Sequence, residues 1–224
     1  MNVPLAIWIA LIAGILLMLA VDLLKHRDAH EIGLREAGTW TAIWVAVGVG
    51  VGAAIWWHYG AEFGLQYFGG YLVEKSLAVD NVFVWALLLA HFAVPARYQH
   101  RVLFYGVIGA LVFRAVFIAA GSVLIASASW VLYLFGVFLI LTGVKMITTR
   151  EQHVDPERSW SLRIARRLIP VSDEYHGQRF WVRQGGVLMA TPLLLVLVVI
   201  EFTDILFAVD SIPAIFAITQ EPFL

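Results

Sequence analysis

Two short acidic strings with a shared pattern lie inside apolar stretches of this chain. Residues 74–81 read EKSLAVDN and residues 204–211 read DILFAVDS. In each string an acid precedes an aspartate by six residues, Ala-Val stands directly before that aspartate, and an amide or hydroxyl residue follows it. Chance similarity between stretches rich in alanine and valine is the competing explanation. The shared pattern favours two copies of one ancestral segment.

The oxygen-bearing side chains of these stretches have the chemistry of a metal site. The two stretches contain no histidine, and the whole chain has no cysteine. Carboxylate, amide and hydroxyl oxygens suit Mn²⁺, Mg²⁺ or Ca²⁺ and not a soft metal. Several carboxylates around one ion would need protons on some of them, which offers a route to exchanging metal against protons. The predicted metal-binding residues are Glu74, Asp80, Asn81, Glu201, Asp204, Asp210 and Ser211.

The composition predicts the elements that position these acids. Hydrophobic residues make up 61% of the 224 residues and charged residues 14%, whereas soluble domains have about 45–50% and about 25%. Apolar stretches of about 20 residues can cross a hydrocarbon core of about 30 Å. The chain is therefore predicted to be an all-α polytopic membrane protein in contact with the lipid bilayer. Six spans are predicted, at about residues 3–24, 39–59, 68–90, 102–124, 130–148 and 191–218.

Lysine and arginine residues predict the orientation, because short cytoplasmic loops are enriched in them. Of the 15 such residues, 13 follow the first, third and fifth spans, and the loops after the second and fourth spans have none. The amino terminus is therefore predicted to lie outside. Residues 150–185 are predicted to form a basic cytoplasmic loop, either an ordinary one or one with an amphipathic helix at the membrane surface.

With this topology the two acidic strings cross the membrane in opposite directions. Such an inverted repeat is typical of secondary transporters, whose substrate site lies near the midplane between the halves. Six residues turn an ideal helix by about 600°, so the two acids of one string lie about 120° apart. Either the helix is interrupted, at Gly69 and Gly70 or at Pro213, or the acids face different gaps. Glu201 and Asp204, three residues apart, are expected on one face.

Three further charged residues lie within the predicted spans. A charge at the centre of a membrane helix costs roughly 2.5–3.5 kcal/mol on insertion scales, so each needs compensation. Lys75 and Arg114 are predicted to be counter-ions, since a lysine can snorkel outward and an arginine can pair with a carboxylate. Asp22 lies at the cytoplasmic end of the first span, where it could meet Lys25 or a lipid headgroup.

These residues resemble the TerC family, and within it the Alx-type bacterial proteins. The similar segments are GYLVEKSLAVDNVFVW at 70–85, RVLFYGVIGALVFR at 101–114, LTGVKM at 141–146 and TPLLLVLVVIEFTDILFAVDSIPAIFA at 191–217. The resemblance implies a bacterial inner-membrane transporter, related in fold to exporters with three-helix inverted repeats, that exports manganese. By position, the metal-handling acids would be Glu74 and Asp80 from the first string, and Glu201, Asp204 and Asp210 from the second.

Two alternative functions remain, one implied by the resemblance and one suggested by the aspartates within the spans. A membrane factor that supplies metal to secreted proteins or assists membrane-protein assembly is the second candidate function. An intramembrane aspartyl protease with Asp80 and Asp210 as its dyad is disfavoured, because FAVDSIPA lacks the glycine-rich signature of such enzymes. No enzymatic activity, organic cofactor or nucleic-acid partner is expected. Members of the family continue into further spans, so the chain is expected to be a C-terminally truncated part of a longer protein.

Overall fold

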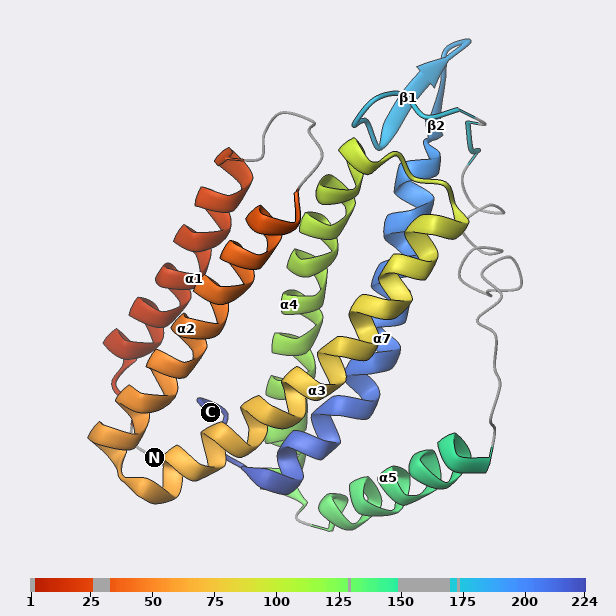
Figure 1. Cartoon of the computed structure of the whole chain (residues 1–224). Helices are drawn as coiled ribbons and strands as arrows, with labels where there is room; N and C mark the ends of the chain where they lie inside the picture. The colour runs from red at the N-terminus through yellow and green to blue at the C-terminus, as the bar shows by residue number, and fades with distance from the viewer. Residues whose placement is uncertain (1–2, 26–32, 129, 149–169, 173) are drawn as a thin grey trace.

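The computed structural model of the chain describes residues 3–25, 33–128, 130–148, 170–172 and 174–224. Within these residues it contains six helices and one two-stranded antiparallel hairpin (Figure 1). The predicted all-α class is confirmed. The elements are α1 (Leu5–Lys25), α2 (Leu34–Tyr59), α3 (Ala61–His91), α4 (Ala96–Ser127), α5 (Val131–Thr148), β1 (Trp181–Gln184), β2 (Val187–Ala190) and α7 (Pro192–Ile218).

The helices overlap all six predicted spans. Four of them, α1, α2, α4 and α7, are long and apolar enough to cross a bilayer. The apolar stretch of α5 is shorter and covers Val131–Lys145. The α3 helix is longer than a bilayer requires but carries Glu74, Lys75 and Asp80 in its central turns. Crossing by α3 and α5 stays a prediction, whereas the polytopic character of the chain rests on the other four helices.

The helices α3 and α7, which carry the two acidic strings, run in opposite directions (Figure 1). They also pack against each other. The turn between α3 and α4 and the hairpin lie at one end of the bundle, and the turn at Gly60 and the C-terminal end of α4 lie at the other. Arg97 and Arg101 begin α4, and Arg179 and Arg183 belong to the hairpin region, so these basic residues gather at one end. Under the positive-inside rule this end would face the cytoplasm, and the orientation of the bundle in the membrane stays a prediction.

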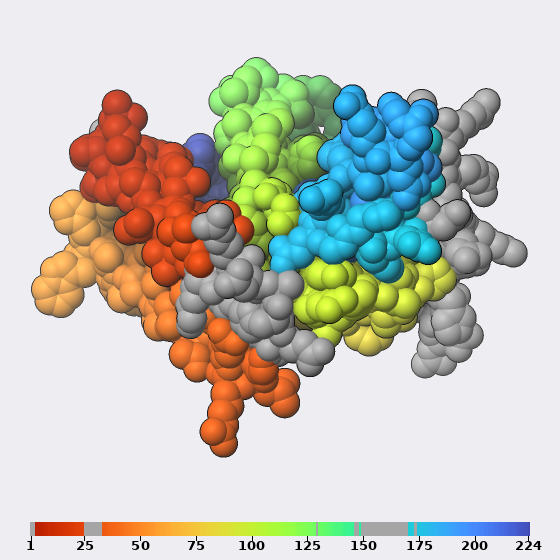
Figure 2. Space-filling view, turned by 90° about the horizontal axis from the view of Figure 1, so that it is seen from above, coloured from red at the N-terminus to blue at the C-terminus, as the bar shows by residue number. Residues whose placement is uncertain are grey.

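Residues 170–172 and 174–190 lie at this end of the bundle beside the turn between α3 and α4, as the view from above shows (Figure 2). The hydroxyl of Tyr175 donates a hydrogen bond to the carbonyl oxygen of Phe92 at 2.7 Å. The strands are joined by Gly185 and Gly186, whose φ values of 57° and 83° suit a two-residue hairpin turn. The hairpin was not predicted from the sequence. The predicted amphipathic helix falls largely on 149–169, outside the described residues.

The α7 helix is the centre of the bundle and packs against α3, α4 and α5. Its residues are apolar on nearly all sides, which is typical of a buried helix. Leu193, Val196 and Ile200 are fully buried, against Leu88 of α3 and Val102 of α4. Polar side chains on the buried face of α7 therefore lie among helices.

Glycines bring α2 and α3 into close contact, as small residues do at interfaces between membrane helices. A Cβ atom added at Gly52 of α2 would lie 2.6 Å from ring atoms of Tyr67 and Phe68. The Tyr67 hydroxyl donates a hydrogen bond to the carbonyl oxygen of Gly48 at 2.8 Å. The two helices thus depend on glycine positions whose neighbours leave no room for a side chain.

We expect Gly52→Ala to destabilise the protein by about 1–3 kcal/mol, the usual cost of an overpacked contact. Gly50→Ala is the matched control, because a Cβ atom there has nothing within 4 Å. Thermal unfolding in detergent would measure both. Equal unfolding temperatures for the two variants would contradict the packing described for α2 and α3.

Candidate ion-binding site at the α3–α4–α7 interface

The α7 helix carries three of the predicted metal-binding residues along one face. Glu201, Asp204 and Ser211 are separated by three and seven residues, which aligns them on a helix with 3.6 residues per turn. Asp204 is 5% exposed and Ser211 is 2% exposed, and Glu201 is half-buried. The three side chains therefore share a face that is directed into the bundle.

Asp204 is held by a tryptophan of α3. The indole Nε1 of Trp85 donates a hydrogen bond to Asp204 Oδ1 at 3.1 Å. Because an indole can only donate, this contact favours an acceptor at Asp204 and fixes the carboxyl group toward the α3–α7 interface. Trp85 lies five residues after Asp80 on α3, just beyond the first acidic string. The helix that carries this string therefore contributes a hydrogen-bond donor to the site.

Three oxygen atoms on this face of α7 are buried and have no hydrogen-bond partner among the described residues. They are Glu201 Oε2, Asp204 Oδ2 and Ser211 Oγ. Buried polar atoms are normally hydrogen-bonded, and an unsatisfied one requires an explanation such as a water molecule or an ion. Three such oxygens on one helix face indicate a place where a polar or cationic ligand binds.

A glycine of α4 makes room for one of these carboxylates. A Cβ atom at Gly109 would collide with both oxygens of the Glu201 carboxylate. One helical turn away, a Cβ atom at Gly106 would lie 3.1 Å from Ile200. The Glu201 carboxylate thus lies directly against the backbone of α4, and any side chain at 109 would displace it.

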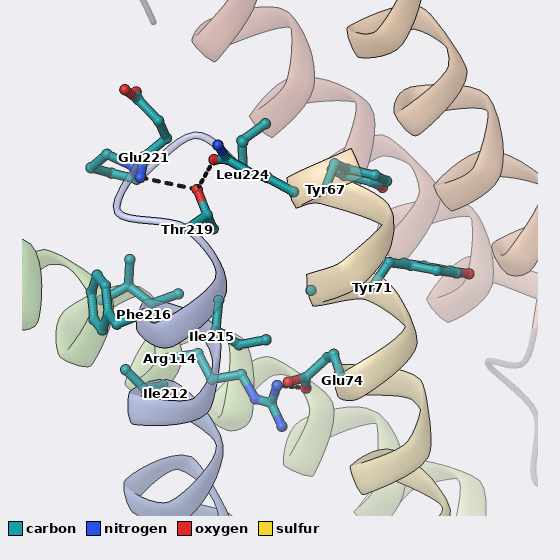
Figure 3. Close-up of a pocket in the computed structure, with 14 residues that line it drawn as sticks. Tyr67, Tyr71, Glu74, Arg114, Ile212, Ile215, Phe216, Thr219, Glu221 and Leu224 are labelled. Carbon is teal, nitrogen blue, oxygen red and sulfur yellow. Dashed lines mark hydrogen bonds and ion pairs between the residues drawn. The ribbon is translucent and has the colours of Figure 1, made fainter. Parts of the chain in front are cut away.

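An ion pair joins α3 to α4 beside this face. Arg114 of α4 and Glu74 of α3 point toward each other and form a salt bridge (Figure 3). Their side chains are 25% and 31% exposed, respectively. The sequence-based prediction that Arg114 pairs with a carboxylate is confirmed. Arg114 also interacts electrostatically with Asp204, so it lies between an acid of α3 and an acid of α7.

Glu74 and Arg114 also line a cavity of about 250 Å³. Its walls include Tyr67 and Tyr71 of α3 and Ile215 of α7 (Figure 3). The three α7 residues with unsatisfied oxygens are not among its lining residues. The ion pair therefore lies between this cavity and the buried carboxylates.

Asp80 and Asp210 lie apart from this face. Both side chains are exposed on the described part of the chain, whereas the adjacent Asn81 is buried. Asp210 interacts electrostatically with Lys145 of α5. The helices α3 and α7 continue without interruption through both acidic strings. Of the two alternatives for acids about 120° apart, the described helices therefore have the second, in which the two acids of one string face different gaps.

The two other charged residues predicted within spans have partners that the sequence did not indicate. Asp22 Oδ2 lies 3.3 Å from His100 Nε2, which links α1 to α4. Lys75 is exposed, with its Nζ 5.4 Å from the centroid of the Tyr71 ring. At that distance a cation and an aromatic face attract each other. In the part of the chain that the structure describes, Lys75 therefore contacts an aromatic ring, and its predicted role as a counter-ion stays a prediction.

The described residues contain no group of three or more acidic or histidine side chains that could hold a metal ion together. The single seven-residue shell expected from the sequence is thus not assembled in this conformation. The Ser211 hydroxyl lies two helical turns away from Asp204 on α7, so what the structure brings together is the two carboxylates of Glu201 and Asp204. Such a set fits a hydrated divalent ion, since Mg²⁺ and similar hard ions often keep several waters and use one or two carboxylates.

Comparison with known proteins assigns this chain to a protein family. Residues 59–224 match the integral membrane protein TerC family. The chain belongs to the TerC family. An uncharacterized membrane protein of Myxococcus xanthus is 47% identical to this TerC-family chain over 219 residues, which are 97% of the chain and 69% of that protein. No solved structure matches.

Other relatives of the TerC-family chain carry a functional name. Alx of Escherichia coli K12, named as a proposed membrane-bound redox modulator, is 44% identical over 228 residues, covering 97% of this chain and 71% of Alx. The Alx protein of Photorhabdus laumondii is 44% identical over 223 residues, covering 96% and 70%. These names place the TerC-family chain among membrane proteins.

Two residues of the site were not predicted from the sequence of this TerC-family chain. Trp85 lies in the segment that carries the family resemblance, but its hydrogen bond joins residues 119 positions apart. Gly109 is one of 18 glycines, and no local pattern distinguishes it. Both residues act through contacts between helices that are distant in sequence, so no spacing within one helix could reveal them.

Proposed function

We propose that this protein is a membrane transporter that exports a divalent cation, with Mn²⁺ as the favoured substrate. The observation that carries the proposal is the line of three buried, unsatisfied oxygens on α7 beside α3 and α4. The site would bind the cation through Glu201 and Asp204, with water completing its coordination. Ser211 lies two helical turns further along α7 and would offer the ion a second polar position on the same face. Two carboxylates match the double charge of the ion.

The chemistry of the site supports a hard cation. Carboxylate and hydroxyl oxygens are preferred by Mn²⁺, Mg²⁺ and Ca²⁺, and anionic substrates would be repelled by two carboxylates. A transported ion must bind weakly enough to leave again. A site with few protein ligands, in which the ion keeps several waters, meets this requirement. The resemblance to the Alx-type branch favours manganese among these ions.

The redox name of the relatives is compatible with metal transport. These 224 residues contain no cysteine, so thiol–disulfide exchange cannot come from their side chains. Manganese itself changes oxidation state, and export of a redox-active metal would alter the redox conditions of a cell indirectly. The proposal thus accounts for such a name without a redox group in this chain.

Exchange for protons is part of the proposal. The two nearby carboxylates of Glu201 and Asp204 carry more negative charge than the single charge of Arg114 can neutralise, so in a low-dielectric interior one of them is expected to hold a proton when no ion is bound. Binding of a divalent ion would therefore release a proton, and departure of the ion would allow proton uptake. We expect metal flux in vesicles to follow a pH gradient and to move protons in the opposite direction.

Transport by the purified full-length protein in liposomes tests the proposal directly. A metal indicator trapped inside should report Mn²⁺ entry, with Mg²⁺ and Ca²⁺ tested in parallel. Absence of flux for all three ions would reject the transporter. A protein that promotes assembly or metal delivery only when partner proteins are added would instead support the second candidate function.

The same assay tests Asp80 and Asp210, whose membership in the metal site stays a prediction. We expect Asp80→Ala or Asp210→Ala to abolish manganese tolerance conferred by the full-length protein, at unchanged membrane level. Their side chains are exposed in the described chain, so they would act on the ion at another stage of its passage than the α7 face. Retained tolerance at normal expression would remove both residues from the site.

A further inference from the structure

Arg114 occupies an unusual place between the two acidic strings. It forms an ion pair with Glu74 of α3 and interacts electrostatically with Asp204 of α7. Glu74 and Asp204 are the first acids of the two strings, at equivalent positions of the predicted repeat. The Arg114 guanidinium thus interacts with two acids that occupy equivalent positions in the predicted repeat.

The chemistry of arginine makes this arrangement a competition. An arginine side chain keeps its charge in proteins, presents five donors, and has a long stem that can change rotamer. Asp204 has one oxygen bound by Trp85 and one without a partner among the described residues. A guanidinium that moved from Glu74 to that free oxygen would occupy the position that a divalent cation needs.

We propose that Arg114 is a tethered cation that competes with the transported ion for Asp204, and that Glu74 is the acid that holds Arg114 away while the ion is bound. The inference rests on the proposed function of the α7 site. It changes the role of Glu74, which the sequence suggested as a metal ligand, to that of a positioning residue. Glu74 then affects metal binding only through Arg114.

The cavity beside the ion pair agrees with this role. Glu74 and Arg114 line it, and the three α7 residues with unsatisfied oxygens do not. Moving Arg114 between the two acids would therefore change the connection between the cavity and the buried carboxylates. The same movement of the Arg114 side chain would release the ion from Asp204 and separate the site from the cavity.

Direct binding of Mn²⁺ to the purified full-length protein in nanodiscs, measured by calorimetry, tests this role. We expect Arg114→Gln to tighten Mn²⁺ binding by about tenfold or more, because a competing charge is removed. We expect Glu74→Gln to weaken it by about tenfold, because Arg114 is then free to pair with Asp204. In the Glu74→Gln/Arg114→Gln double variant, binding should be as tight as in Arg114→Gln alone.

The double variant also guards against misfolding, since it removes both charges of the pair together. Arg97→Gln is the matched control, because Arg97 is exposed at the start of the same helix, and its affinity should equal that of the wild type. If Glu74→Gln lowers the Mn²⁺ affinity equally in the wild-type protein and in Arg114→Gln, Glu74 is itself a ligand and the inference is overturned. The inference would also be overturned if the wild type binds Mn²⁺ and neither Arg114→Gln nor the double variant binds it more tightly. No binding of Mn²⁺, Mg²⁺ or Ca²⁺ to any variant would reject the proposed function and the inference with it.

Transport kinetics separate this role from a structural one. Loss of the competitor should lower the Mn²⁺ concentration for half-maximal transport and also slow turnover, since the ion leaves less readily. A merely structural arginine would lower the amount of active protein and leave the half-maximal concentration unchanged, which would count against the competition.

Discussion

Asp204→Asn should abolish cation export by the full-length protein. Asparagine has nearly the same shape as aspartate, and its side-chain oxygen can still accept the hydrogen bond from Trp85. The substitution therefore removes the negative charge and keeps the packing. Loss of one partner in a buried charge pair costs about 2–5 kcal/mol, so we expect Mn²⁺ affinity to fall by about 100-fold or more.

The experiment is Mn²⁺ uptake into liposomes and Mn²⁺ binding in nanodiscs, each at matched protein amounts. Glu62→Gln is the control, since Glu62 is an exposed acid in the first turn of α3 and its removal should leave transport unchanged. Asp204→Asn with normal flux and normal thermal stability would show that the buried carboxylate takes no part in transport.

Gly109→Ala should impair the same site from the facing helix. The added methyl group would occupy the position of the Glu201 carboxylate, which must then rotate away from its place beside Asp204. Alanine is a better helix former than glycine by about 1 kcal/mol, so a loss cannot come from the propensity of α4. We expect Mn²⁺ affinity to fall by about tenfold or more, the effect of about 1.4 kcal/mol.

A second substitution sharpens this test. The shorter side chain in Gly109→Ala/Glu201→Asp leaves room for the methyl group, so the double variant should recover part of the affinity. Gly143→Ala in α5 is the matched control, because a Cβ atom there has nothing within 4 Å. Wild-type affinity in Gly109→Ala would mean that Glu201 does not bind the ion from the described position.

The substitutions above all act on the interfaces of α7 with α3 and α4. The two helices run in opposite directions and pack against each other, as segments of an inverted repeat must do. Their acids do not contribute equally, however: the α7 string supplies buried oxygens, whereas α3 supplies Trp85 and the partner of Arg114. The two strings are therefore not equivalent in the described conformation. The proposed transporter would need such a difference if its site opens to one side at a time.

Composition and hydrophobic periodicity were enough to predict the membrane class and the helices of this chain. Apolar composition and helix length are local properties, so the six helical ranges could be predicted without knowledge of the packing. The opposite directions of α3 and α7 followed from the number of spans between them. The shared face of Glu201 and Asp204 followed from helical periodicity alone.

The sequence did not reveal which acids lie close together, because that depends on how the helices pack. The direction of a side chain around a helix axis depends on how that helix is rotated and packed against its neighbours, and no spacing within one chain segment specifies it. Packing therefore separated Asp80 and Asp210 from the buried face, joined Asp204 to Trp85, and placed the Glu201 carboxylate on the bare backbone of Gly109. These contacts join residues on different helices, because a binding site in a helical bundle is formed between helices and not along one.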